Sequence, residues 1–135
     1  MDKESIREIE EGNELRLQFE KRQGLLPVVV QESSSGDILM IASVNGEALN
    51  QTIKTGEATY WSTSRKSLWL KGETSGNTLL IDEILVDCDQ DALIYKVTLD
   101  GDGACHTKNE KGSPRKSCFY RKLNINSLEL EFLDK

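Results

Sequence analysis

The sequence predicts a single, mostly β domain of the α+β class, with a compact barrel-like or sandwich arrangement and a few short helices. Short runs rich in β-branched and aromatic residues recur along the chain, with polar turns between them. No repeat of fixed period and no long linker interrupts these runs. A chain of 135 residues can bury one hydrophobic core without disulfides, so we expect residues 1–135 to form one domain.

The N-terminal region, residues 3–20, combines two patterns. The spacing of Ile6 and Ile9 is helical and predicts a short helix. The apolar residues within 15–19 instead alternate with polar ones, which predicts an extended or mixed stretch. Gly24 then interrupts the pattern, so we expect the first long strand to begin after it.

Two β-branched runs, 25–32 and 38–43, flank a turn rich in Ser, Gly and Asp. This pattern predicts a strand, a turn and a second strand. Asn45 is a residue type that caps the N-terminus of a helix, and Gly56 is one that ends a helix. A short helix is therefore expected over 47–54.

The second half of the chain continues the β pattern. Residues 58–62 and 67–71 predict a hairpin, because a four-residue polar turn joins them. Further strands are expected over 79–87, 92–99 and 118–122. The Gly-containing stretches 72–77 and 100–116 are expected to be loops, and residues 123–135 give a weaker signal.

Composition and charge exclude several classes of protein. Hydrophobic residues make up 37% and charged residues 30% of the chain, which is typical of a globular protein. The net charge of −6 argues against a nucleic-acid partner, although a local basic cluster can still bind a small anion. No apolar run approaches a bilayer-spanning length, and the polar N-terminus shows no secretory signal. Three cysteines cannot all pair, which favours reduced thiols and a cytoplasmic location.

The side chains best suited to chemistry lie in three short clusters. All three cysteines and the only histidine fall within residues 88–118. The first cluster also places aspartates at alternate positions, Asp87, Asp89 and Asp91, around Cys88. This combination suggests a thiolate site for zinc beside an oxygen-ligand site for a hard cation.

The aspartate cluster has one geometric consequence if its segment is a strand. Alternate side chains then share a face, so the three carboxylates would lie about 6.6–7 Å apart and Cys88 would point to the opposite face. An EF-hand is excluded because its sixth and twelfth positions hold Ala92 and Thr98 instead of Gly and Glu. A magnesium site and a solvated acidic edge both stay open, and a lone cysteine such as Cys88 can also be a small buried apolar residue.

Cys105 and Cys118 are thirteen residues apart, and no CxxC pair exists in the chain. A structural zinc site normally has four protein ligands in paired spacing. Three thiolates and a water would instead form a catalytic site, in which zinc lowers the pKa of the water toward about 7. A non-enzymatic module with structural zinc stays the alternative. His106 can be a fourth ligand, a general acid or base, or a loop histidine.

The loop and hairpin segment 64–77 gathers cations and hydroxyl groups around two glycines. Such groups suit the binding of a phosphate ester. Exposed hairpins often have the same composition, so the pattern alone is a weak signal for a site.

Four motifs in order, KGETSGN, VDCDQDALIYKV, GACHT and SCFYR, resemble phosphoribosyl-AMP cyclohydrolases of histidine biosynthesis. The upstream GLLPVVVQESSSGDILMIASVNGEAL and TYWSTSRKSLW are also similar to that family, so the resemblance covers about residues 18–122. It implies an enzyme that hydrolyses the N1–C6 bond of the adenine ring in phosphoribosyl-AMP, the third step of histidine biosynthesis. It also implies an intertwined homodimer that uses Zn²⁺ and Mg²⁺.

The resemblance assigns a role to each motif residue. It implies three zinc ligands drawn from both subunits: Cys88, Cys105 and Cys118. It implies three magnesium carboxylates: Asp87, Asp89 and Asp91. His106 matches the histidine of the family's CHT motif and is implied as a proton-transfer residue. The residues that match the SR and KGxxSG motifs are implied as substrate phosphate contacts: Arg65, Lys71 and Ser75.

The chain departs from the family pattern between the second and third cysteines. The family joins CHT to SCFYR by two or three residues, whereas here KNEKGSPRK forms the connection. A polar insertion over 108–116 can loop out at little thermodynamic cost. Many members also carry a fused pyrophosphohydrolase domain, so this chain is expected to be monofunctional. A zinc nucleobase deaminase is disfavoured because neither the HxE nor the PCxxC signature occurs.

Overall fold

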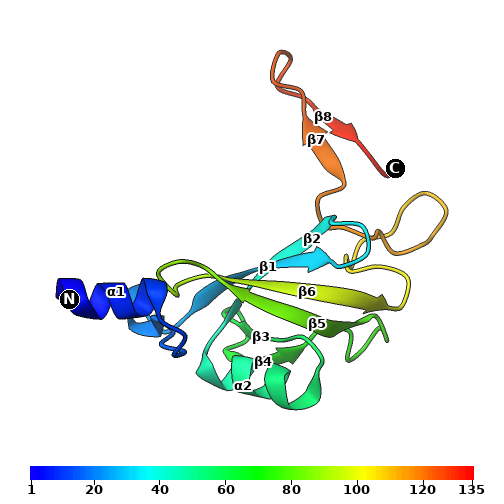
Figure 1. The fold of residues 1–135 in the computed structure, drawn as a ribbon. Helices are drawn as coiled ribbons and strands as arrows, with labels where there is room; N and C mark the ends of the chain where they lie inside the picture. The colour runs from blue at the N-terminus through cyan, green and yellow to red at the C-terminus, as the bar shows by residue number, and fades with distance from the viewer.

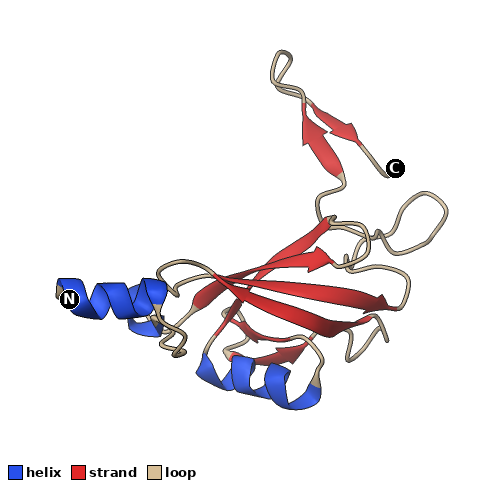
Figure 2. Cartoon of the chain, in the orientation of Figure 1, coloured by secondary structure: helices blue, strands red, loops and turns tan.

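The strands form one four-stranded sheet and two separate hairpins in a computed structural model that covers residues 1–135 (Figures 1 and 2). The helical elements are α1 (Lys3–Glu11), the 3₁₀ helix η1 (Phe19–Arg22) and α2 (Gly46–Thr55). The strands are β1 (Leu26–Glu32), β2 (Ile38–Val44), β3 (Thr59–Ser62), β4 (Ser67–Leu70), β5 (Thr78–Val86), β6 (Leu93–Asp100), β7 (Arg121–Leu123) and β8 (Leu130–Phe132). The expected α+β, mostly β class is confirmed.

The main sheet has the strand order β2-β1-β6-β5, so β2 and β5 are its two edges. β1 and β6 pair in parallel, and the other two pairs are antiparallel. The hairpin β3–β4 and helix α2 lie on one face of this sheet, and the hairpin β7–β8 projects away from it (Figure 1). Neither helix is long and apolar enough to cross a membrane.

The core lies between the main sheet and the layer formed by α2 and β3–β4. Alternate residues of β1 (Leu26, Val28 and Val30) are fully buried, as the two-residue period of a strand requires. Tyr60 of β3 and Tyr95 of β6 stack in this core with their ring centroids 6.1 Å apart. The apolar side chains of the two layers therefore fix β3–β4 beneath the sheet.

Helix α2 confirms the capping prediction. The Asn45 side chain accepts a hydrogen bond from the Ala48 N–H at 2.8 Å, and Gly56 ends the helix in the left-handed region with φ of 75°. The buried Thr52 hydroxyl lies within 3.0 Å of the Ala48 and Thr59 carbonyls and accepts from the Thr59 N–H. Thr52 thus ties α2 to β3.

One strand prediction near the C-terminus needs correction. The strand expected over 118–122 begins only at Arg121. The Cys118 N–H donates to the Leu39 carbonyl of β2, so Cys118 lies outside the β7–β8 ladder. Within the tail, where no strand was predicted, residues 130–132 form β8 and pair with β7. Near the N-terminus, the helix predicted from Ile6 and Ile9 is confirmed.

We predict that Thr52→Val lowers the free energy of unfolding by about 1–3 kcal/mol, because it leaves the buried Thr59 N–H without an acceptor. The matched control is Thr55→Val, since Thr55 bonds backbone groups of the same helix end but is exposed to water. Urea denaturation measures both variants. Equal losses in the two variants would contradict the role of Thr52.

Candidate metal centre

The backbone around Cys105 is held by the segment that precedes Cys118. The Ala104 and Cys105 N–H groups donate to the carbonyls of Lys116 and Arg115, both at 3.0 Å. Gly103 allows this close approach, because a Cβ there would overlap the Arg115 carbonyl. The Cys118 N–H donates to the Leu39 carbonyl at 2.8 Å, which fixes Cys118 beside the edge strand β2.

The thiols of Cys105 and Cys118 lie close enough to affect each other's ionisation. Burial raises the pKa of Cys118 to about 11, and the charge that the neighbouring Cys105 thiolate would carry adds to the rise. Burial alone would raise the pKa of Cys105. Its contacts with the Thr107 hydroxyl, 3.0 Å from the sulfur, and with the Thr107 N–H outweigh this effect. Together with Cys118 they lower the pKa below its usual value. The chain therefore brings two sulfur ligands together, a donor set that suits zinc.

Lys71 lies in the interior beside this thiol pair and is only 7% exposed. Burial lowers the pKa of Lys71, while Cys118 and Cys105 act in the opposite direction. Its ammonium also lies 6.0 Å from the ring centroid of Trp69, and the Arg65 guanidinium lies 5.9 Å from the same ring. Two of the predicted phosphate contacts, Arg65 and Lys71, thus meet around one indole.

The other predicted residues on these loops are exposed. Ser75 lies in the turn between β4 and β5, where its hydroxyl accepts a hydrogen bond from the Asn77 N–H at 3.2 Å. His106 follows the buried Cys105 and points its side chain into an exposed environment. An exposed imidazole next to the thiol pair is accessible to a bound small molecule.

The aspartate cluster is a turn and not the extended strand that the alternation suggested. β5 ends at Val86, and the Asp87 carboxylate accepts hydrogen bonds from the Asp91 and Ala92 N–H groups at 2.8 and 3.1 Å. Gln90 takes a left-handed conformation with φ of 57°, which reverses the chain.

The turn changes which side chains meet. One ligand atom each from Asp87, Cys88 and Asp89 lies within 4.8 Å of the other two. The expectation that Cys88 faces away from the aspartates is therefore wrong, because that expectation required an extended backbone. Oxygen and sulfur ligands lie side by side here, so a hard and a soft metal ion can bind next to each other at this turn.

Asp91 is the most buried of the three aspartates and is paired with two cations of η1. Lys21 bridges Asp89 at 2.7 Å and Asp91 at 2.9 Å, and Arg22 reaches Asp91 at 3.1 Å. Hydrogen bonds to Asp89 and Asp91 raise the pKa of Lys21 to about 12, and the same contact with Lys21 holds the pKa of Asp89 well below its usual range. Burial raises the pKa of Asp87.

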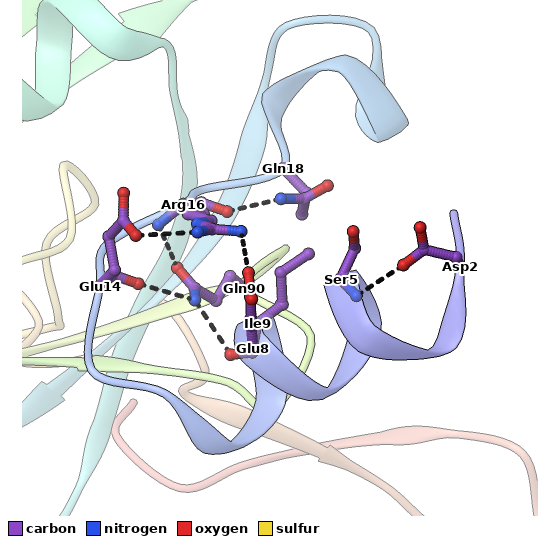
Figure 3. Close-up of polar contacts among 8 residues, drawn as sticks. All are labelled: Asp2, Ser5, Glu8, Ile9, Glu14, Arg16, Gln18 and Gln90. Carbon is purple, nitrogen blue, oxygen red and sulfur yellow. Dashed lines mark hydrogen bonds and ion pairs between the residues drawn. The ribbon is translucent and has the colours of Figure 1, made fainter.

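The side chain of Gln90 connects this turn to the N-terminal segment (Figure 3). Its amide nitrogen donates to the Ile9 and Glu14 carbonyls at 3.0 and 3.2 Å, and its amide oxygen accepts from the Arg16 N–H at 2.7 Å. Helix α1 and the chain that follows it are thus fixed against the aspartate turn. A mid-turn glutamine gave no signal of this role in the sequence.

Within one chain, Cys88 is separated from the other two cysteines. Cys118 is bonded to β2 at one edge of the main sheet, whereas Cys88 follows β5 at the other edge. Three inter-strand spacings, about 14 Å in all, lie between those edges. Ligands of one zinc ion must each lie about 2.3 Å from the metal, so a single chain cannot supply all three sulfurs.

Comparison with known proteins gives a consistent result. A family model described as phosphoribosyl-AMP cyclohydrolase matches residues 40–120. The chain is 49% identical to a protein named phosphoribosyl-AMP cyclohydrolase from Desulfotalea psychrophila, over 87% of this chain and 88% of that protein. It is 51% identical to one from Hyphomonas neptunium (84% and 81% covered) and 52% identical to one from Rhodopseudomonas palustris (87% and 73% covered).

These matches confirm the resemblance that the four sequence motifs indicated. They cover the segments that position the thiol pair, the aspartate turn and the Arg65–Lys71 region. Identity near 50% over most of both chains also implies the same fold and the same class of enzyme. This chain belongs to the phosphoribosyl-AMP cyclohydrolase family of enzymes.

Proposed function

We propose that this enzyme hydrolyses the N1–C6 bond of the adenine ring in phosphoribosyl-AMP, as a zinc-dependent step of histidine biosynthesis in the cytoplasm. The observation that best supports the proposal is the Cys105–Cys118 thiol pair beside the exposed His106. A non-enzymatic module with structural zinc is set aside because the relatives are named as enzymes.

Cys105 and Cys118 of one subunit and Cys88 of the other would hold the zinc ion. The sheet separates Cys88 from the pair within a chain, so a symmetric homodimer completes two equivalent sets of three sulfurs. Bound zinc with an open position would supply a water of lowered pKa and act as a Lewis acid. Thr107 orients the Cys105 sulfur for this role through its hydroxyl.

His106 would transfer the proton. Its imidazole follows a zinc ligand directly and is exposed, so a purine bound over the site would be within its reach. A neutral imidazole can accept a proton and return it to the ring nitrogen N1 as the bond to C6 breaks. His106 is thus assigned the role of general acid and base.

Mg²⁺ would bind at the aspartate turn through Asp87, Asp89 and Asp91. These carboxylates offer the oxygen ligands that Mg²⁺ prefers. Because Cys88 shares the turn with Asp87 and Asp89, the magnesium and zinc ions would lie next to each other. Lys21 now pairs with Asp89 and Asp91, so it would have to move aside when magnesium binds.

The substrate phosphate would be bound by Arg65, Lys71 and Ser75. Arg65 is exposed on the β3–β4 turn and is free to make charge-assisted hydrogen bonds to a phosphate. Lys71 is closer to the thiols, so it would act on the part of the substrate nearest the metal. The substrate would then extend from the thiol pair toward the β3–β4 turn.

We predict that Cys88→Ala, Cys105→Ala and Cys118→Ala each lower turnover of phosphoribosyl-AMP by about 100-fold or more, because each removes a sulfur ligand. Ultraviolet absorbance measures turnover, and atomic emission measures zinc per chain. A chelator should reduce wild-type turnover in the same way. Full zinc content and turnover in any one variant would refute that ligand.

Mixing the cysteine variants tests whether the ligands come from two chains. Unfolding and refolding Cys88→Ala together with Cys105→Ala should restore about a quarter of wild-type activity, because half of the dimers are mixed and each has one complete site. Cys105→Ala mixed with Cys118→Ala is the matched control and should restore none. Equal recovery in the two mixtures would argue against shared ligands.

We also predict that Arg65→Gln raises KM for phosphoribosyl-AMP about 10-fold or more with little change in kcat, since a charged hydrogen bond to phosphate contributes about 1.5–3 kcal/mol. Lys66→Gln, a neighbouring exposed cation in the same turn, is the control and should leave KM nearly unchanged. The phosphate assignment is wrong if the two variants behave alike in steady-state kinetics.

A further inference from the structure

The N-terminal segment of the chain places two cations against the aspartate turn. The Gln18 N–H donates to the Gln90 carbonyl at 2.8 Å, and the Gln90 side chain holds the residues that precede Gln18 (Figure 3). The 3₁₀ helix η1 begins directly after Gln18, so its side chains are brought to the carboxylates of the turn. Two of them, Lys21 and Arg22, pair with Asp91.

The two cations are held in different ways. Arg22 makes two contacts with Asp91, because its guanidinium lies 3.1 Å from the carboxylate and its Nε donates to the backbone carbonyl at 2.9 Å. The Lys21 ammonium contacts two carboxylates, Asp89 at 2.7 Å and Asp91 at 2.9 Å, and about half of the Lys21 side chain is exposed. A lysine has a flexible four-carbon stem. The ammonium can therefore leave the turn while the backbone of η1 stays bonded to it, whereas Arg22 is part of the turn.

The charges of the turn favour exchange of Lys21 for a divalent cation. When ionised, the carboxylates of Asp87, Asp89 and Asp91 carry three negative charges, and Lys21 and Arg22 supply two positive ones. Replacement of an ammonium by a divalent ion removes the negative charge that remains. Carboxylate oxygens are also the ligands that Mg²⁺ prefers. Binding of Mg²⁺ at this turn would thus exchange one cation for another.

We propose that Lys21 is a resident counter-ion of the aspartate turn, which stabilises the turn without metal and sets the affinity for Mg²⁺ by competing with it for Asp89 and Asp91. The inference rests on the magnesium site proposed above. The ion pairs of Lys21 are lost when the metal binds, so their free energy is subtracted from that of metal binding. The same contacts stabilise the chain while no metal is bound. Lys21 therefore has opposite effects on metal-free stability and on metal affinity.

The test is calorimetric titration of MgCl₂ into the full chain, dialysed against magnesium-free buffer, with and without the substitution Lys21→Met. Methionine keeps an unbranched side chain of similar length but lacks the ammonium. We expect Lys21→Met to bind Mg²⁺ about 10-fold more tightly than the wild type, because two partly exposed ion pairs no longer have to be broken.

Lys54→Met is the matched control for net charge. Lys54 is an exposed lysine in the last turn of α2, and its loss changes the net charge by the same amount. Its affinity for Mg²⁺ should stay within about 2-fold of the wild type, because salt screens distant charges. Lys21→Arg, which keeps a cation at the turn, should bind Mg²⁺ no more tightly than the wild type. Equal affinities of Lys21→Met and Lys54→Met would overturn the proposal.

Thermal unfolding gives a readout that does not depend on turnover. Without Mg²⁺, Lys21→Met should unfold a few degrees below the wild type, because the carboxylates of the turn repel one another once the ammonium is gone. At saturating Mg²⁺ the two chains should unfold at the same temperature, since the metal has replaced Lys21 in the wild type as well. A difference that persists at saturating Mg²⁺ would contradict the exchange, because Lys21 would then be a fixed part of the fold.

The same measurements separate this proposal from the proposed function. Equally tight Mg²⁺ binding by the wild type and Lys21→Met would overturn only the exchange. Absence of Mg²⁺ binding in both chains would overturn the exchange and the magnesium site together. If the affinities change as expected but the wild type does not turn over phosphoribosyl-AMP, the hydrolase activity alone is contradicted.

Discussion

The width of the main sheet is the constraint on which the candidate site depends. Cys118 is bonded to the β2 edge and Cys88 follows the β5 edge, so the paired strands β1 and β6 hold them apart. The four-stranded sheet is open, so its two edges lie three strand spacings, about 14 Å, apart. The same geometry exposes Cys88 and its flanking carboxylates at the end of an outer groove, where a second chain has access. With ligands shared as proposed, catalysis would depend on assembly of two chains.

Each of the two candidate ligand clusters has a lysine of the same chain beside it. Lys21 is paired with carboxylates on the surface, and these contacts raise its pKa to about 12. Lys71 is buried beside thiols, and burial lowers its pKa. The two lysines differ because direct pairing stabilises an ammonium, whereas loss of water destabilises it. A metal ion at the aspartate turn would have to displace Lys21, whereas Lys71 is held beside the thiol pair in the interior.

The parts of the fold that depend on local patterns could be predicted from the sequence. Helix α2, from its Asn45 cap to Gly56, is one example, and the alternation in β1 is another. The aspartate turn could not be predicted, because acids at alternate positions occur in strands as well as in turns. What makes the turn is the Asp87 carboxylate, which accepts from the Asp91 N–H, and the left-handed backbone of Gln90. The contacts of Lys21 with this turn join residues 68 or more positions apart, and no local pattern indicates them. The expectation that Cys88, Cys105 and Cys118 bind one zinc ion from two subunits came from the resemblance to a family and not from their spacing.

The connection between the second and third cysteines shows how an insertion can be compatible with a metal site. Gly103 and Ala104 pack against the Arg115–Lys116 end of the insertion. These contacts fix the backbone of Cys105 next to the residues that precede Cys118. The remaining residues loop outward, where their length has little effect on the position of either sulfur. Arg115 has a second function there, because its stacking on Tyr120 directs the chain that leaves Cys118. The insertion therefore supports the projecting hairpin β7–β8 and also bonds the backbone of Ala104 and Cys105.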